Sequence, residues 1–434
     1  MTDLWLALPA DVQDALWLAA LLCAAPALGL WLTRGYRTRP LTRALLRRHL
    51  GANAMFVALI AVSVGLGVAL SAQERALRVA SARAADGFDL VIAAPGGEIA
   101  ALMATVYLQP SDIPLLSGET FAAVAADPLI ALAAPIAFGD SHDGAPIVGT
   151  VAEFALQLAG PLAEGRLFAA HGEAVIGARS PLALGDRIAP EHGAAPEIAA
   201  TRALGETPDA HDDAELTVVG RMAPTGSPWD RAILIPIETV FELHGLASGH
   251  APGDTHIGAP FDAASFPGTP AIVVRPHRLA DAYQLRARYG SAQTMAFFPA
   301  TTLAGLHAIL GDVRQILSVM ALTAEALVAA AVLSALVIVI RLFAEGLELL
   351  RAIGAPRRYL FAVVWSYCTA LLTLGAGLGL MAGLAATAGL SQVLSRMTDL
   401  MIVASVSWPE AHLVAAFVLL GGVFALIPAW TATR

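Results

Sequence analysis

Histidine and carboxylate side chains gather in the middle of the chain, where they could bind a metal ion. Eight of the eleven histidines lie between residues 142 and 277. Asp213 lies two residues after His211, and His250 and His256 flank Asp254. Imidazole and carboxylate groups are common ligands of Zn²⁺. These spacings match no standard zinc signature, and surface histidines without a metal are the alternative. His211, Asp213, His250 and His256 are therefore metal candidates only.

The sequence excludes two common catalytic signatures. All 26 basic residues are Arg, and the chain contains no Lys. A P-loop uses a Lys to reach the β- and γ-phosphates of a nucleotide, so the chain cannot carry a standard Walker A site. A G-x-S-x-G nucleophile elbow is also absent. We therefore expect a non-catalytic chain that binds no cofactor itself, and any ATP and Mg²⁺ would belong to another subunit.

Glu325 is an ionisable residue within a long apolar run, MALTAEALVAAAVLSALVIVI. An ionisable group at membrane depth costs roughly 3 kcal/mol and usually faces a cavity or a partner. Glu325 is expected in the outer leaflet, where it could contact an amphipathic substrate or ligand. The alternative is a structural Glu near the interface that pairs, for example, with Arg314.

The composition indicates a membrane protein. Hydrophobic residues make up 57% of the chain and charged residues 14%, with a mean hydropathy of +0.67, whereas soluble domains carry about a quarter charged residues. About 20 apolar residues cross the ~30 Å of hydrocarbon in a bilayer. Acidic residues precede the first apolar run, so we interpret it as a retained anchor and not as a signal peptide. Five predicted spans lie near residues 14–33, 52–72, 316–341, 359–388 and 410–430.

The arginines predict the orientation of these spans. Six Arg and no acidic residue lie between the first two spans, and a second Arg group lies between the third and fourth. Short loops rich in Arg stay in the cytoplasm. We therefore expect a multi-pass protein of a bacterial cytoplasmic (inner) membrane, with its large central domain in the periplasm.

The central domain is acidic, with 26 Asp and Glu against 13 Arg in residues 72–311. This balance disfavours nucleic acid as a partner. Strand-like and helical stretches alternate, which predicts a mixed α/β domain. The expected fold class is thus membrane α-helical with a large extracytoplasmic mixed α/β domain. The predicted parts are an extra N-terminal transmembrane anchor (1–36), an Arg-rich cytoplasmic helix and second span (37–72), the periplasmic domain (73–315) with an inserted β-rich subdomain (about 160–260), and three transmembrane helices (316–434).

The stretch RLFAEGLELLRAIGAPRRYLFAVVWSY, residues 341–367, joins two predicted spans on the cytoplasmic side. An amphipathic segment runs to Gly354, Ala355 and Pro356, and an Arg pair and the next span follow. This break lets the short helix lie on a partner while the next helix enters the bilayer. A permease driven by a separate ATPase needs such an element. An ordinary interfacial helix and turn is the alternative.

The segment LELLRAIGAPRRYLFAVV resembles the coupling segment of FtsX/MacB-type ABC transporter permeases, the FtsX-like permease family. The Arg-rich stretch 39–51, the outer domain between two spans and the final ALIPAWTATR are also similar to that family. DLVIAAPGG, IAFGDSHD and IVGT resemble a subgroup of it. The resemblance covers about residues 37–434. The chain departs from the family pattern at the predicted span 14–33, because members of the family usually have four spans and five are predicted here.

The resemblance implies a homodimer in the lipid bilayer, bound to two copies of a separate ABC ATPase. When the ATPase subunits close with bound ATP, their movement would be transmitted to the outer domains. In this scheme, called mechanotransmission, the substrate need not cross a continuous channel. The coupling segment would be residues 342–358. Its implied coupling residues are Glu348, Arg351, Gly354, Ala355, Arg357 and Arg358.

Gly375, Gly379 and Gly383 lie on one face of the fourth predicted span. Small residues at this spacing permit a close approach of two helix backbones. Packing within the protomer and a seam between two protomers are both open from the sequence.

The expected function is that of a permease subunit that exports, extracts or releases a substrate at the outer face of the membrane. The alternative is a transmembrane signal transducer that uses the same stroke to activate a periplasmic protein partner, such as a cell-wall hydrolase. A standalone receptor would leave the coupling segment unexplained.

Overall fold

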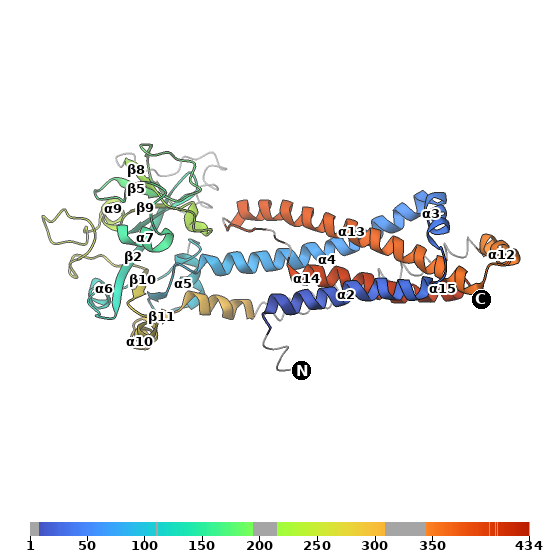
Figure 1. Ribbon diagram of the computed structural model, residues 1–434. Helices are drawn as coiled ribbons and strands as arrows, with labels where there is room; N and C mark the ends of the chain where they lie inside the picture. The colour runs from blue at the N-terminus through green and yellow to red at the C-terminus, as the bar shows by residue number, and fades with distance from the viewer. Residues whose placement is uncertain are drawn as a thin grey trace. The chain divides into compact units, whose positions relative to one another are not determined.

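The computed structural model describes residues 8–109, 112–193, 215–308, 344–398, 400–403, 405 and 407–433. The chain divides into two compact units (Figure 1). The helical unit holds residues 1–77, 312–393 and 402–434, and the sheet unit holds residues 78–311 and 394–401. The predicted third span, with Glu325, lies outside the described residues.

Four long helices dominate the described part of the helical unit. They are α2 (Ala10–Thr33), α4 (Leu50–Ala84), α13 (Arg357–Thr398) and α14 (Trp408–Phe424), with the short helices α3 (Arg39–Arg48), α12 (Ala344–Ala352) and α15 (Leu426–Thr431). Among the described residues, four helices are long and apolar enough to cross a membrane: Ala10–Thr33, Leu50–Ala84, Arg357–Ser395 and Trp408–Thr431. Each of the predicted spans 14–33, 52–72, 359–388 and 410–430 falls within one of them.

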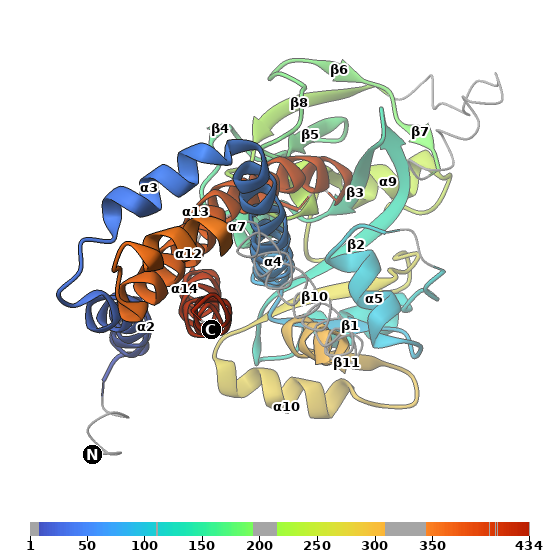
Figure 2. The ribbon, with the colours of Figure 1, turned by 90° about the vertical axis from the view of Figure 1, so that its right-hand side faces the viewer.

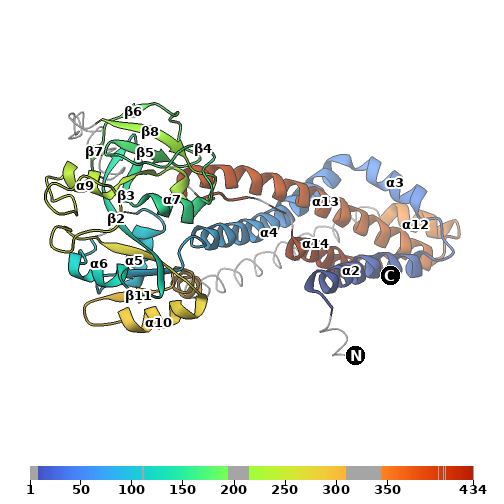
Figure 3. The same ribbon diagram turned by 60° about the vertical axis from the view of Figure 1, so that its left-hand side comes forward.

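The extra N-terminal helix α2 belongs to this helical unit. It lies alongside α14 in Figures 1 and 3. The indole N–H of Trp408 donates to Asp11 Oδ1 (3.1 Å), and His412 Nε2 donates to the carbonyl of Asp14 (2.9 Å). These contacts tie the beginning of α2 to the beginning of α14.

The centre of the helical unit is formed mainly by α4 and α13. Apolar side chains recur every three or four residues on the facing sides of both helices, as expected for a buried helical stripe. The indole N–H of Trp365 donates to the carbonyl of Gly422 (2.8 Å), which adds α14 to this core. The buried residues include Ile60, Val64 and Val68 of α4 and Leu360, Val364, Cys368, Leu371 and Ala376 of α13.

The sheet unit is a mixed α/β structure. Its main strands are β1 (Leu90–Ala93), β2 (Ile130–His142), β3 (Ala145–Thr150), β5 (Glu173–Ile176), β8 (Leu216–Arg221), β9 (Ile233–Pro236), β10 (Ala271–Pro276) and β11 (Met295–Phe297). The two-residue strands are β4 (Glu164–Gly165), β6 (Arg187–Ile188) and β7 (Glu191–His192). The helices are α5 (Glu98–Thr105), α6 (Gly118–Ala125), α7 (Ala152–Ala159), α9 (Ile237–Leu243) and α10 (Leu279–Tyr289).

The long strand β2 connects two parts of one sheet with the order β11-β1-β10-β2-β3-β9-β5-β8-β4 (Figure 2). Its first half pairs with β10, from Ile130 opposite Pro276 to Ile136 opposite Ala271. Its second half pairs with β3. The order β11-β1-β10-β2, with helices after β1 and β10, is that of a β-α-β-β-α-β unit. The strands that come from residues 160–260 continue the same sheet beyond β3 and also pair with the end of β2.

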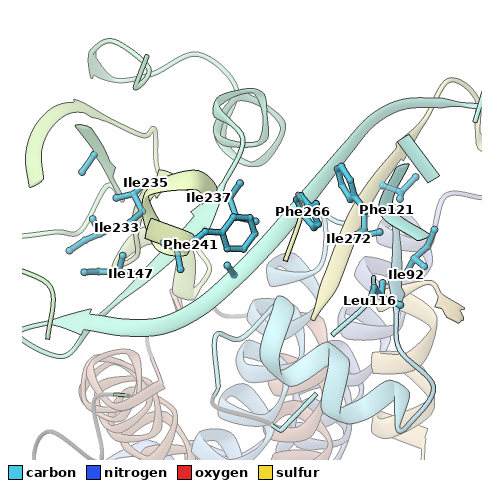
Figure 4. Packing of buried hydrophobic residues seen from close by; sticks show 14 of the residues in the cluster. Ile92, Leu116, Phe121, Ile147, Ile233, Ile235, Ile237, Phe241, Phe266 and Ile272 are labelled. Carbon is cyan, nitrogen blue, oxygen red and sulfur yellow. The ribbon is translucent and has the colours of Figure 1, made fainter. Parts of the chain in front are cut away.

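Large apolar side chains fill both halves of the sheet unit. Figure 4 shows Ile147, Ile233 and Ile235 on one side of the long strand and Ile92, Phe121 and Ile272 on the other. Phe121 stacks on Phe266 with ring centroids 4.7 Å apart. The apolar, β-branched composition of β1, β9 and β10 explains why these short runs form buried strands.

The strands β1, β2, β3 and β10 and the helices between them confirm the alternation that predicts a mixed α/β domain. The sequence analysis missed α7, α9 and β11. The helix α9 begins directly after Pro236, the last residue of β9, so its apolar residues continue the pattern of β9. The strand β11 is three residues long, too short for a periodicity to emerge.

Candidate functional site

The predicted coupling segment contains a helix, α12, that ends in a glycine turn. Gly354 has a φ of +102°, a left-handed conformation that glycine adopts without strain. The N–H of Gly354 donates to the carbonyl of Arg351, and the N–H of Ala355 donates to the carbonyl of Leu350, both at 3.0 Å. These two bonds form a Schellman motif. Pro356 follows directly, and only the four residues 353–356 separate α12 from α13.

One face of α12 is buried and the other is exposed. Leu347 is 6% exposed and packs with Leu350 against the helical core. On the opposite side, Leu349 of α12 and Ile353 in the turn that follows α12 are 66% and 75% exposed. Exposed apolar patches that are rimmed by polar residues mark surfaces that bind a protein or a membrane. Of the predicted coupling residues, Glu348, Arg351, Gly354, Arg357 and Arg358 are exposed and Ala355 is half-buried.

The glycines Gly375, Gly379 and Gly383 of α13 face α4 of the same chain. A Cβ on Gly379 would lie 2.8 Å from the carbonyl oxygen of Ala61, and a Cβ on Gly383 would lie 2.7 Å from that of Gly65. Real Cβ atoms essentially never approach other heavy atoms to within 3.0 Å. The glycine ladder therefore packs within the protomer, which is one of the two alternatives that the sequence leaves open.

A buried polar group, which the sequence analysis missed, joins α14 to α4. The carboxylate of Glu410 is fully buried and accepts hydrogen bonds from Arg75 (2.9 Å) and Ser71 (3.1 Å). It also accepts the backbone N–H of Ser407 (3.0 Å), which completes the capping box of α14. The S-x-x-E pattern at the start of an apolar run was the signal for this residue.

Two of the four metal candidates, His250 and His256, lie in the described residues and come close together. His250 Nε2 is 3.1 Å from Oε1 of the buried Glu238, and His256 Nδ1 is 2.7 Å from Asp254 Oδ1. The hydrogen bond to Asp254 raises the pKa of His256, and the same bond lowers the pKa of Asp254. These contacts form two hydrogen-bonded pairs, and the ligand atoms of His250, Asp254 and His256 also lie within 4.8 Å of one another. His211 and Asp213 lie outside the described residues.

A second group of potential ligands, Asp140, His192 and His244, was not found from the sequence. Their ligand atoms all lie within 4.8 Å of one another. Asp140 and His192 belong to different strands, and His244 follows α9. No spacing in the sequence joins these residues, because the pairing of strands brings them together.

No protein-family model and no curated protein matches the chain. Among solved structures, the chain is similar to the periplasmic region of MacB from Actinobacillus actinomycetemcomitans. The TM-score is 0.30 and the sequence identity is 12%, over 51% of this chain and 94% of the MacB region. This likeness is coarse and carries no argument about function.

Proposed function

We propose that this chain is the permease subunit of an ABC transporter of the FtsX/MacB type in a bacterial cytoplasmic membrane. The chain would work as a homodimer with two copies of a separate ATPase, which would bind ATP and Mg²⁺. It would couple ATP hydrolysis to export, extraction or release of a substrate at the outer face, without catalysing a reaction itself.

The exposed face of α12 is the observation that carries this proposal. Leu349 and Ile353 expose apolar surface beside Glu348 and Arg351, while Leu347 anchors the opposite side of the helix. A partner that covers this face would bury the apolar pair and contact both charges. The Schellman turn at Gly354 fixes the direction in which α12 leaves α13, so a displacement of α12 would act directly on α13.

The lengths of α4 and α13 support the transmission step. With 35 and 42 residues, they are roughly 52 and 63 Å long at 1.5 Å per residue. A hydrocarbon core of ~30 Å requires only about 20 residues. The last residues of both helices, 78–84 of α4 and 394–398 of α13, belong to the sheet unit. The glycine ladder packs α13 directly on the backbone of α4, so the two helices are expected to move together.

Co-purification from native membranes tests this proposal. The full chain with an affinity tag is extracted in mild detergent, and the proteins bound to it are identified by mass spectrometry. We expect an ABC ATPase with the wild type and at least a tenfold loss of it with Glu348→Ala/Arg351→Ala. A matched control, Glu119→Ala/Arg278→Ala, removes an exposed acid and an exposed Arg of the sheet unit and should retain the ATPase.

The absence of any ATPase from the wild-type complex, under conditions that preserve other membrane complexes, would overturn the proposal. Equal loss in both double variants would show that charge in general, and not α12, holds the partner. A stable periplasmic protein on the sheet unit, with no small ligand, would favour the signal transducer instead.

A further inference from the structure

Three side chains from separate elements of the sheet unit meet beside β2. Asp140 in β2 lies directly opposite His192 in β7, and His244 is the residue after α9. The register of β2 against β3 shifts between Ala137 and Asp140. Such an irregularity re-aims the side chain that follows it. The fold therefore holds Asp140 between two histidines that are distant in the sequence.

The distances between these side chains fit ligands around one ion. Asp140 Oδ1 is 3.4 Å from His192 Nδ1 and 3.6 Å from His244 Nε2. In a tetrahedral site with bonds of ~2.0–2.1 Å, neighbouring ligand atoms are ~3.3–3.4 Å apart. Both observed distances are longer than the usual N–H···O hydrogen bond of about 2.9 Å. The same spacing fits an imidazole–carboxylate ion pair, and it also fits two ligand pairs around one ion.

The tautomer of His244 is set by its backbone contact. His244 Nδ1 lies 2.8 Å from the carbonyl oxygen of Val240. A carbonyl can only accept a hydrogen bond, so Nδ1 carries the proton and the neutral ring presents the lone pair of Nε2. That lone pair is on the atom nearest Asp140 Oδ1. Metal-binding histidines commonly donate their other ring N–H to such an acceptor, which orients the ring.

The surroundings of the group leave one side open. The side chain of Asp140 is 1% exposed, that of His244 is 25% exposed and that of His192 is 57% exposed. A buried carboxylate favours a nearby cation strongly, because water screens it little.

We propose that Asp140, His192 and His244 form a binding site for a divalent transition-metal ion, with Zn²⁺ as the ion that two imidazoles and one carboxylate suit best. The open side at His192 supplies entry, and a fourth ligand from solvent completes the tetrahedron. This proposal stands whether or not the chain works with an ATPase.

The other histidine group, His250, Asp254 and His256, serves as the internal comparison. Its Asp254–His256 distance of 2.7 Å is that of a direct hydrogen bond. An ion between those two atoms would have to force them apart. The geometry therefore assigns the metal to Asp140, His192 and His244, although the sequence pattern favours the other group.

Cobalt binding to the full chain tests the assignment. The chain is purified in detergent with a tag that contains no histidine, treated with a chelator and titrated with Co²⁺, whose visible absorption is intense in tetrahedral sites. We expect one Co²⁺ per chain that Zn²⁺ displaces, and binding at least about tenfold weaker in Asp140→Asn and His244→Gln. His171→Gln is the matched control, because His171 is also partly exposed and lies 3.1 Å from a carboxylate, Glu242.

The outcomes separate the alternatives. The proposal is overturned if the wild type gives no tetrahedral Co²⁺ spectrum, or if His256→Gln abolishes binding while His244→Gln retains it. The side chain of His192 is more than half exposed and contributes little to the core. His192→Gln should therefore fold normally, so that a loss of binding in this variant can be assigned to the lost ligand. Retained binding in His192→Gln, with a normal elution profile and circular dichroism, would exclude His192 as a ligand and overturn the three-ligand site.

Discussion

The helical unit and the sheet unit are packed by different means. In the helical unit, α13 approaches α4 at glycines, where backbone atoms of the two helices nearly touch. In the sheet unit, the space between strands and helices is filled by large side chains such as Trp229, Phe154 and Phe241. The difference follows from the solvent that each unit is expected to meet. Lipid gives little reward for burying an apolar side chain, so helices there gain stability from close contact, whereas water drives apolar side chains into a core.

This comparison predicts different sensitivities at the positions compared. Trp229 in the sheet unit should be sensitive to the loss of its side chain, and Gly379 in the helical unit should be sensitive to the gain of one. Substitutions at these positions test this contrast.

The largest effect is expected from Trp229→Ala in the sheet unit. Trp229 is fully buried, and its ring contacts Phe154 and Phe88 with centroids 5.3 and 6.0 Å apart. Removing a buried aromatic side chain costs about 3–5 kcal/mol. The thermal unfolding midpoint of the sheet unit in the full chain should fall sharply. Trp229→Phe keeps the ring contacts, so it should be much milder, and an equal loss in both variants would show that packing is not the cause.

Gly379→Leu should be the most harmful of the helical-unit substitutions. Its new side chain would meet the carbonyl oxygen of Ala61 and the Cβ of Val64, both 2.8 Å from the position of the added Cβ. Backbone atoms cannot rotate away, so α13 must separate from α4, at a cost of about 3 kcal/mol. We expect a strong fall in the amount of membrane-integrated chain and in its resistance to thermal aggregation.

Gly377→Leu is the control for this prediction. It lies in the same helix, two residues away, and an added Cβ meets nothing within 4 Å. Its cost should be near zero, since leucine is a better helix former than glycine. If Gly377→Leu and Gly379→Leu accumulate equally, the close contact of α13 with α4 is wrong.

The sequence predicts only part of the packing in the two units. The spacing of the three glycines indicates a close contact, but nothing in it names α4 as the partner. The strands β1 and β10 are recognisable from Leu90–Ala93 and Ala271–Pro276 because buried β-branched residues have a local pattern. The group Asp140, His192 and His244 is not recognisable, because it depends on the register of β2 against β7 and on where α9 ends. His250 and His256 are metal candidates in the sequence because only six positions separate them. Closeness in the sequence is a poor guide to ligand geometry.

Glu410→Ala tests whether the helical unit also depends on buried polar contacts. The substitution would leave Arg75, whose side chain is 20% exposed, without its carboxylate, and would remove the capping box of α14. Loss of one partner of a buried pair and of a helix cap should cost about 2–3 kcal/mol. Ser71 and Ser407 donate to different oxygens of Glu410, and Glu410→Gln keeps only one acceptor oxygen. It therefore retains one of these two hydrogen bonds, and its thermal midpoint should lie between those of the wild type and Glu410→Ala. If both variants equal the wild type, the polar link contributes nothing.

The smallest effect is expected at the surface of the sheet unit, from Glu173→Gln. The hydrogen bond from Arg166 lowers the pKa of Glu173 from its usual 4.5 to about 2. The folded state thus favours the carboxylate, so this stabilisation is complete above pH ~5 and is lost as the pH falls toward 2. Because Arg166 is 57% exposed, solvent screening limits the gain to ~1 kcal/mol or less. The wild type should unfold at a slightly higher temperature than Glu173→Gln at pH 7, and the two midpoints should converge as the pH is lowered from about 5 to 3. A difference that stays constant with pH would assign the effect to the shape of the side chain and not to its charge.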